Sequence, residues 1–169
     1  MRFTIGLLLT ALFCQGAQAE LIDDVNDRGE LRIAVEANTP QYNFMDAEKP
    51  AGFEIELGQE LARELDVRAE FVVVEDDLLQ DVVDGKFDIA LDQLVATPAL
   101  KERLDFSEPY SQQATIGKAP VNLAIAFPKG NPAFQSAVDN ALERIKADGR
   151  LAAMTQKWLS ADASQAAKP

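Results

Sequence analysis

Two carboxylates and one hydroxyl stand where predicted strands end or a predicted helix begins. Glu36 closes a predicted strand over 31–36, and Asp92 comes just after another over 87–91. In parallel α/β sheets, ligands bind in the crevice outside the carboxyl ends of the strands, so these two acids could hold an amine. Thr97, followed by a proline, is predicted to cap a short helix whose free N–H groups could hold an anion. The two binding preferences conflict, and the residues alone leave both open.

Catalytic and metal chemistry find little support in the composition. The chain has no histidine, which removes the commonest general base and the commonest metal ligand. Ser107 therefore has no imidazole to activate it as a nucleophile. The acidic run 75–77 is typical of a solvated face or a helix cap, and neither a phosphate loop nor a dinucleotide-binding glycine pattern is present. We predict no catalytic residue, no metal and no cofactor.

The charge balance is strongly acidic. The chain carries 16 basic and 28 acidic residues, a net charge of −12. Nucleic acids and anionic membrane surfaces are therefore poor partners, whereas a small polar or cationic solute or a basic protein is compatible. The alternative interpretation is that the charge serves solubility alone.

Residues 1–19 have the pattern of a secretory signal peptide. Arg2 supplies a positive start, 5–13 form a short apolar core, and the segment ends on Ala-Gln-Ala, a small-x-small cleavage pattern. We predict cleavage before Glu20, a periplasmic location and no membrane anchor. The single cysteine follows a phenylalanine, where a lipid-anchored start would need a small residue. The alternative is that this segment is a buried helix of the fold.

The 150 residues that would remain of the 169 suit one domain. Strands and helices alternate along them, which predicts an α/β fold with a mostly parallel sheet flanked by helices. The segment 161–169 is predicted to be a flexible tail. The strands are expected at 31–36, 69–74, 87–91 and 122–127, and the helices at 54–65, from 76–77 to 85, from 131 to 148, and around 151–158.

Three segments carry more specific patterns. The nearly continuous apolar run 71–74 predicts a strand buried on both faces of the sheet. The polar segment 38–52, with two prolines, predicts a loop. Asn131 is expected to cap a long helix with proline at its first position. The apolar stripe of that helix consists of Phe134, Val138, Ala141, Leu142 and Ile145.

An ordered set of motifs resembles the bacterial extracellular solute-binding proteins of family 3, the polar amino-acid type of ABC-transporter binding protein. The resemblance implies a lobe of the type II periplasmic-binding-protein fold and a transport-associated binding, accessory or sensor role. It also implies a permease or a sensor of the cell envelope as a protein partner. The motifs are GELRI at 29–33, GFEIEL at 52–57, TP at 97–98 leading to DFSEPY at 105–110, DG at 148–149 and KW at 157–158.

One departure from the family concerns the second lobe. Family members build a second lobe of comparable size after the block that resembles DFSEPY, and the chain then returns to the first lobe. Here only the eleven residues 111–121 separate that block from the returning strand. They can close a loop at modest entropic cost but are too few for an α/β lobe. We therefore predict the amino-terminal lobe only, as one domain over 20–160, without a hinged two-jaw closure.

A second departure concerns the carboxylate clamp. The resemblance implies an arginine three residues after Thr97, which would hold the ligand's α-carboxylate, and this position is Leu100. Loss of its two charge-assisted hydrogen bonds costs on the order of several kcal/mol. Val95 stands where a hydroxyl residue is common. Lys101 and Arg103 have a different helical phase from position 100, so we do not expect either to substitute.

The resemblance also maps the ligand-binding positions onto this chain. Asp92 stands where a small residue is usual, and an aromatic residue of the first loop corresponds to Thr39, with Tyr42 nearby. The mapped ligand-binding residues are Glu36, Thr39, Tyr42, Asp92, Gln93 and Thr97.

Two other function classes remain. One is a docking or regulatory module of the envelope without a small-molecule ligand. In that case Tyr42, Phe44 and Tyr110 would lie in an exposed patch on the face that the missing lobe uncovers, whereas the alternative is that they pack in the lobe's own rim. The other is an enzyme, since a few relatives in the family are dehydratases. It is disfavoured here by the missing lobe, histidine and arginine.

Overall fold

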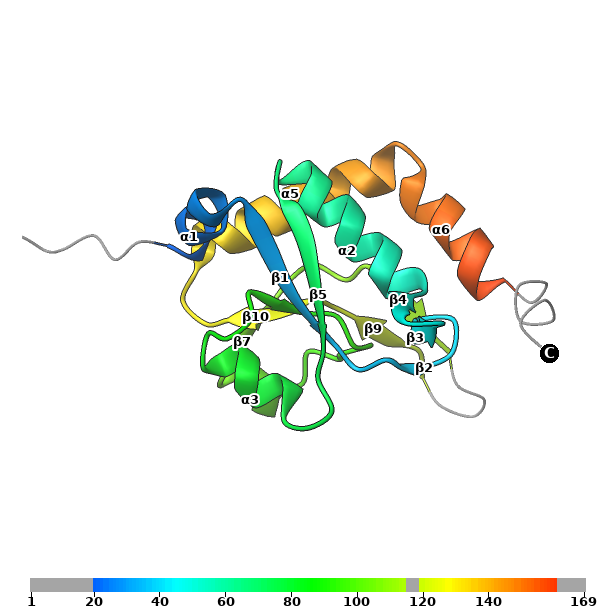
Figure 1. The fold of residues 1–169 in the computed structure, drawn as a ribbon, viewed down its shortest axis with the longest axis horizontal. Coiled ribbons are helices and arrows are strands. Elements are labelled where there is room, and N and C mark those ends of the chain that lie inside the picture. Colours follow the sequence, from blue (N-terminus) through cyan, green and yellow to red (C-terminus); the bar gives the residue numbers. More distant parts are fainter. Residues whose placement is uncertain (1–19, 115–118, 161–169) are drawn as a thin grey trace, which may run out of the picture.

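A five-stranded sheet organises the computed structural model, which describes residues 20–114 and 119–160 (Figure 1). In sheet order, the strands are β5 (Arg68–Val73), β1 (Glu30–Val35), β6 (Ile89–Ala90), β10 (Ala126–Pro128) and β7 (Leu104–Phe106). β1 pairs in parallel with β5 and β6, whereas β10 is antiparallel to β6 and β7. Four of the five strands thus point the same way, which confirms the predicted mostly parallel α/β sheet.

Helices cover both faces of this sheet. In Figure 1, α1, α2, α5 and α6 lie above the strands and α3 lies below them. Each face has its own core, because the side chains of β1 alternate: Leu31 and Ile33 join the larger cluster, and Ala34 joins the smaller one. The helices are α1 (Leu21–Arg28), α2 (Phe53–Glu64), α3 (Leu78–Val83), α4 (Pro98–Lys101), α5 (Pro132–Ala147) and α6 (Arg150–Leu159).

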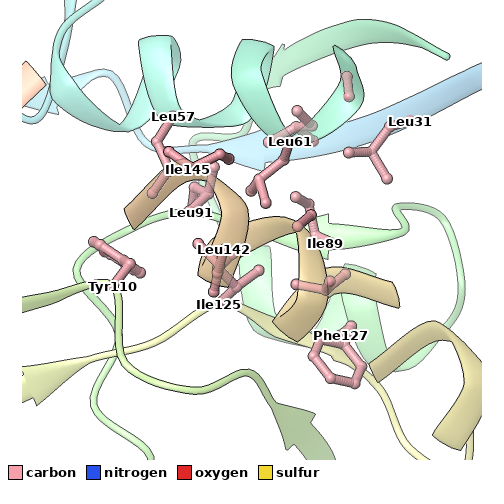
Figure 2. Packing of buried hydrophobic residues seen from close by; sticks show 14 of the residues in the cluster. Leu31, Leu57, Leu61, Ile89, Leu91, Tyr110, Ile125, Phe127, Leu142 and Ile145 are labelled. Atoms are coloured by element: carbon pink, nitrogen blue, oxygen red, sulfur yellow. The ribbon is translucent and has the colours of Figure 1, made fainter. Parts of the chain in front are cut away.

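The larger core lies between α2, α5 and the sheet (Figure 2). Leu57 and Leu61 of α2, Leu142 and Ile145 of α5, and Leu91 and Ile125 beside the strands lie in one cluster (Figure 2). All five residues of the predicted α5 stripe are buried, which confirms that stripe. Strong helical periodicity therefore predicted the packing face correctly.

Two small antiparallel sheets flank the central one. β2 (Asn38–Thr39), β3 (Asn43–Asp46) and β4 (Lys49–Ala51) form the first. The predicted loop over 38–52 is therefore wrong, since its short strands are held by pairing with one another. Gly52 ends this sheet at φ 126°, and a Cβ there would lie 2.3 Å from the Tyr42 carbonyl oxygen.

The second small sheet pairs β8 (Ser111–Gln113) with β9 (Val121–Leu123). The two strands pair directly and antiparallel, with Ser111 opposite Leu123 and Gln113 opposite Val121. The predicted strand over 122–127 is split, since β9 belongs to this ribbon and β10 to the central sheet. The apolar run looks the same along its length, so the sequence does not show that it leaves one sheet and enters another.

Two further predictions need correction. β5 is an edge strand that pairs with β1 only, and Arg68, Glu70 and Val73 are exposed, so it is not buried on both faces. Asn131 precedes α5, but its side chain accepts from the Leu21 N–H at the start of α1 (3.0 Å), a helix that was not predicted.

The segments 1–19 and 161–169 lie outside the described residues, so the signal peptide and the tail stay predictions. Between residues 20 and 160, and apart from 115–118, no helix combines the length and apolarity needed to span a bilayer.

Gly58, in the middle of α2, allows the close contact between this helix and the sheet. A Cβ at this position would lie 2.9 Å from Ile33 Cδ1 and from two ring carbons of Phe71. We expect Gly58→Ala to lower the free energy of unfolding by about 1–3 kcal/mol, because the overpacking outweighs the better helix propensity of alanine. Urea denaturation measures this, with Gln59→Ala on the exposed side of α2 as control. Unchanged or higher stability of Gly58→Ala would contradict the packing described here.

Candidate functional site

A crevice opens at the carboxyl ends of β1 and β6. Glu36 directly follows β1, and Asp92 lies two residues after β6. Both line one cavity of about 460 Å³, together with Asp77 at the start of α3 and with Arg103. The other lining residues are Leu78, Leu79, Gln80 and Leu94. The structure therefore brings two of the six mapped ligand-binding residues together at the edge of the sheet where α/β proteins bind ligands.

The charges around this cavity are unbalanced. In the described part of the chain, none of the three carboxylates forms a salt bridge. Glu36 accepts a hydrogen bond from Asn38 Nδ2 (2.9 Å), and Arg103 donates to Gln80 Oε1. Burial and the negative charge of Glu36 raise the pKa of Asp92 to about 6, although a hydrogen bond from Asn43 opposes the shift. The cavity thus favours a cation over an anion.

A second carboxyl group lies behind Asp92, in the core. Glu54, in the first turn of α2, has no exposed surface. Its oxygens accept hydrogen bonds from Asn43 Nδ2 (2.7 Å), from the Gln93 N–H (2.7 Å) and from the Tyr110 hydroxyl. Burial raises the pKa of Glu54 to about 7, and the charge of Asp92 adds to the shift, whereas the bonds from Tyr110 and Gln93 oppose it.

Asn43 connects the two carboxyl groups. Besides Glu54, its Nδ2 lies within hydrogen-bond distance of Asp92 Oδ1 (3.3 Å) and the Leu91 carbonyl (3.3 Å). Its Oδ1 is buried without a partner in the described structure. Sequence reasoning missed Asn43 and the burial of Glu54, because an acid in the first turn of a helix is ordinarily a solvent-facing residue that complements the helix dipole. Only the tertiary contacts reveal the cluster.

The other mapped residues lie outside the cavity wall. Gln93 supports Glu54 from behind, through its backbone N–H. Thr39 donates its hydroxyl to Asn38 Oδ1, and Tyr42 packs edge-on against Phe53, with ring centroids 6.0 Å apart. Thr97 caps α4, as predicted, by accepting from the Leu100 N–H (3.3 Å), and its side chain is exposed. The structure therefore does not bring Thr39, Tyr42 and Thr97 into the same pocket as Glu36 and Asp92.

Leu100, Lys101 and Arg103, in α4 and just after it, have different surroundings. Leu100 packs against the smaller core cluster. Arg103 follows the end of α4 at Lys101 and lines the cavity, where it donates to Gln80 Oε1. That it does not substitute for an arginine at position 100 stays a prediction. Lys101 lines a separate pocket with Ser107 and Asn122.

The aromatic residues that could form a docking patch pack within the lobe. Tyr110 is 3% exposed. Phe44 packs edge-on against Trp158 of α6, with ring centroids 6.0 Å apart. The large hydrophobic residues that are exposed among those described, Met45, Val73 and Val121, come from three different strands. Nor does the described part of the chain gather three or more residues that could hold a metal ion.

Comparison with known proteins shows which family this chain is similar to. The family model of the bacterial extracellular solute-binding proteins, family 3, matches residues 31–161. The L-cystine-binding protein TcyJ of Escherichia coli is 32% identical over 97 residues, 56% of this chain and 36% of the relative. The cyclohexadienyl dehydratase of Pseudomonas aeruginosa is 31% identical over 121 residues, 69% of this chain and 43% of that enzyme. The chain thus spans less than half the length of these relatives.

A solved structure of one domain is also similar. The crystal structure of the arginine-bound form of domain 1 from TmArgBP aligns with a TM-score of 0.67 and 26% identity, over 72% of this chain and 98% of that chain. The family model covers most of the chain, including the crevice and the Glu54 cluster. The protein therefore belongs to the bacterial extracellular solute-binding proteins, family 3.

Proposed function

We propose that this protein is a single-lobed, periplasmic binding protein that holds a small cationic solute in the crevice between Glu36 and Asp92. The observation that carries the proposal is that two acids following neighbouring parallel strands line one cavity without a paired cation among the described residues. Its role would be transport-associated or sensory and not catalytic, with a permease or sensor of the envelope as partner. The predicted signal peptide supports this location.

Binding by one lobe is chemically reasonable. The similar structure of domain 1 from TmArgBP is an arginine-bound form, so one domain of this fold can hold a ligand that carries a guanidinium group. In an open crevice, each charge-assisted hydrogen bond contributes about 1.5–3 kcal/mol. Two such bonds give about 3–6 kcal/mol, and the middle of this range corresponds to a dissociation constant on the order of 0.1–1 mM. Weak, rapidly reversible binding is therefore expected.

Calorimetry on residues 20–169 tests the proposal. The probes are L-arginine, its decarboxylated amine agmatine, and L-glutamate as an anionic control. We expect L-arginine and agmatine to bind with similar affinity, because the crevice recognises the cation and lacks the family's carboxylate clamp. No binding of either cation at about 10 mM would overturn the proposal. If L-arginine bound with low-micromolar affinity and agmatine bound much more weakly, the α-carboxylate would be recognised after all. This result would contradict the proposed loss of the clamp.

Restoring the arginine of the clamp should change the ligand preference. We expect Leu100→Arg to raise the affinity for L-arginine relative to agmatine by about tenfold or more, because only the amino acid has an α-carboxylate for the new guanidinium, whereas the added positive charge repels agmatine. Calorimetry with both probes measures this, and circular dichroism checks that the fold persists.

Ala99→Arg is the matched control for Leu100→Arg. It adds the same charge to α4 at an exposed position one residue away, so it should improve binding of neither probe. Equal gains for both variants would show that general charge, and not the clamp position, determines the preference.

A further inference from the structure

The Glu54–Asn43–Asp92 cluster places two carboxyl groups on one amide. The Asn43 Nδ2 has two hydrogens, yet three acceptors surround it: Glu54 Oε2, the Leu91 carbonyl and Asp92 Oδ1. Its Oδ1 has no donor in the described structure. The cluster therefore has more acceptors than donors at its centre, and one additional proton on a carboxyl group would reduce this deficit.

The two carboxyl groups form no salt bridge with any described residue. Two carboxylates that share a site without a cation disfavour simultaneous ionisation. Arg103 lines the cavity, but it bonds to Gln80 and pairs with neither acid. The titratable and charged groups that face the cluster are Tyr42 before β3, Tyr110 before β8, Glu36 after β1, and Asp77 and Arg103 across the cavity.

The cluster joins the core to the crevice. Asp92 lines the cavity, whereas Glu54 is fully buried behind it. Resting on the proposed function above, we propose that a cation entering the crevice displaces one proton held by the Glu54–Asn43–Asp92 cluster, so that solute binding and proton release are linked.

The direction of the linkage follows from electrostatics. A cation beside Asp92 and Glu36 stabilises the ionised carboxylates and lowers the pKa values of the cluster, so protons leave when the solute binds. The cluster titrates as a unit, and the free groups have pKa values of about 6 for Asp92 and about 7 for Glu54. Affinity for the cation should therefore fall below about pH 6–7, by up to about tenfold per pH unit. Above about pH 8 it should be constant.

Calorimetry with agmatine in two buffers of different ionisation enthalpy measures the protons released. At about pH 6.5 we expect a fraction of one proton per agmatine bound, and at about pH 8.5 close to none. Agmatine itself keeps its charge over this range, so the released protons come from the protein. Binding without any buffer-dependent heat at the lower pH would overturn the linkage but leave the proposed function intact. No binding at any pH would overturn both.

A second measurement does not depend on ligand binding. Carbon-13 NMR of the side-chain carboxyl carbons follows Asp92 and Glu54 in the free protein. At least one of them should titrate above about pH 5.5. If both titrate near about pH 4, as ordinary carboxyl groups do, the inference is wrong even where agmatine binds.

Tyr110→Phe separates this role from a merely structural one. It removes the hydroxyl that donates to ionised Glu54, so the pH midpoint of proton release should rise by about one unit. Asp66→Asn, just before β5 and hence at the opposite edge of the sheet, should leave the midpoint unchanged. Equal midpoints in Tyr110→Phe and the native chain, with the fold intact, would contradict the inference.

Discussion

Asp88→Ala is expected to lower the free energy of unfolding by about 3–5 kcal/mol, because it leaves two arginines and a backbone N–H without their shared acceptor. The Asp88 carboxylate has no exposed surface. It pairs with Arg28 of α1 and with Arg32 of β1, whose Nη2 lies 2.7 Å from Oδ1. The Arg32 N–H also donates to Oδ2 (2.8 Å). The hydrogen bond from Arg32 correspondingly raises the pKa of that guanidinium.

This ion-paired group matters for the site as well as for stability. Asp88 immediately precedes β6, and Arg32 lies in β1. The contact therefore fixes the register of the two strands whose opposite ends position Glu36 and Asp92. We expect Asp88→Ala to weaken cation binding in addition to stability, even where the variant remains folded at low temperature.

Asp81→Ala is the control for this comparison. Asp81 pairs with Lys86 at 2.6 Å on the surface, where solvent screens the interaction, so its loss should have a much smaller effect. Thermal and urea unfolding of both variants give the comparison. Similar losses for the two would mean that the burial of Asp88 is less important than the structure indicates.

The double variant Glu36→Gln, Asp92→Asn should lower the affinity for agmatine by about a hundredfold. Each substitution removes one charge-assisted contact and keeps the size of the side chain, which corresponds to roughly tenfold per residue. The amide oxygen that replaces the Asp92 carboxylate can still accept the hydrogen bond from Asn43, so the cluster behind the crevice should stay intact. The single variants, measured by calorimetry at about pH 8, should each lose about tenfold.

Asp66→Asn again provides a matched control for charge. Asp66 has φ 58°, a left-handed conformation that asparagine tolerates well, and it is exposed far from the crevice in sequence and in the sheet. The affinity of this variant for agmatine should equal that of the native chain. If Asp66→Asn weakens binding as much as the crevice variants do, the acidic character of the whole protein explains the binding, and the crevice does not.

The sequence correctly predicted elements whose buried residues follow a regular spacing within the element itself. The five buried residues of α5 recur at helical spacing. They therefore lie on one face of the helix, and the spacing alone predicts which residues are buried. β5 was misjudged because an apolar run is the same whether a strand lies at the centre or at the edge of a sheet. The strands within 38–52 are short, and each is held by pairing with a neighbouring strand. The residues of one short strand do not show that such a partner is present.

The residues of the candidate site likewise differ in how far the sequence could predict their positions. Glu36 and Asp92 were expected at one edge of the sheet because both follow parallel strands, and they do line one cavity. That they bind a ligand stays a prediction. Thr39 and Tyr42 were mapped from the family resemblance alone, and here they contact neighbours outside the cavity. Glu54, Asn43 and Tyr110 come from three separate segments, so their hydrogen-bonded cluster depends on the assembled fold.

The most direct test of a cation-binding crevice is a nitrogen-15 HSQC titration of residues 20–169 with agmatine. We expect saturable shifts of the backbone amides of Glu36, Asp92 and Gln93 and of residues 77–80, with a midpoint on the order of 0.1–1 mM. Amides at the start of β5 should not move. Shifts that stay linear at every concentration, or that cluster away from the ends of β1 and β6, would contradict the account.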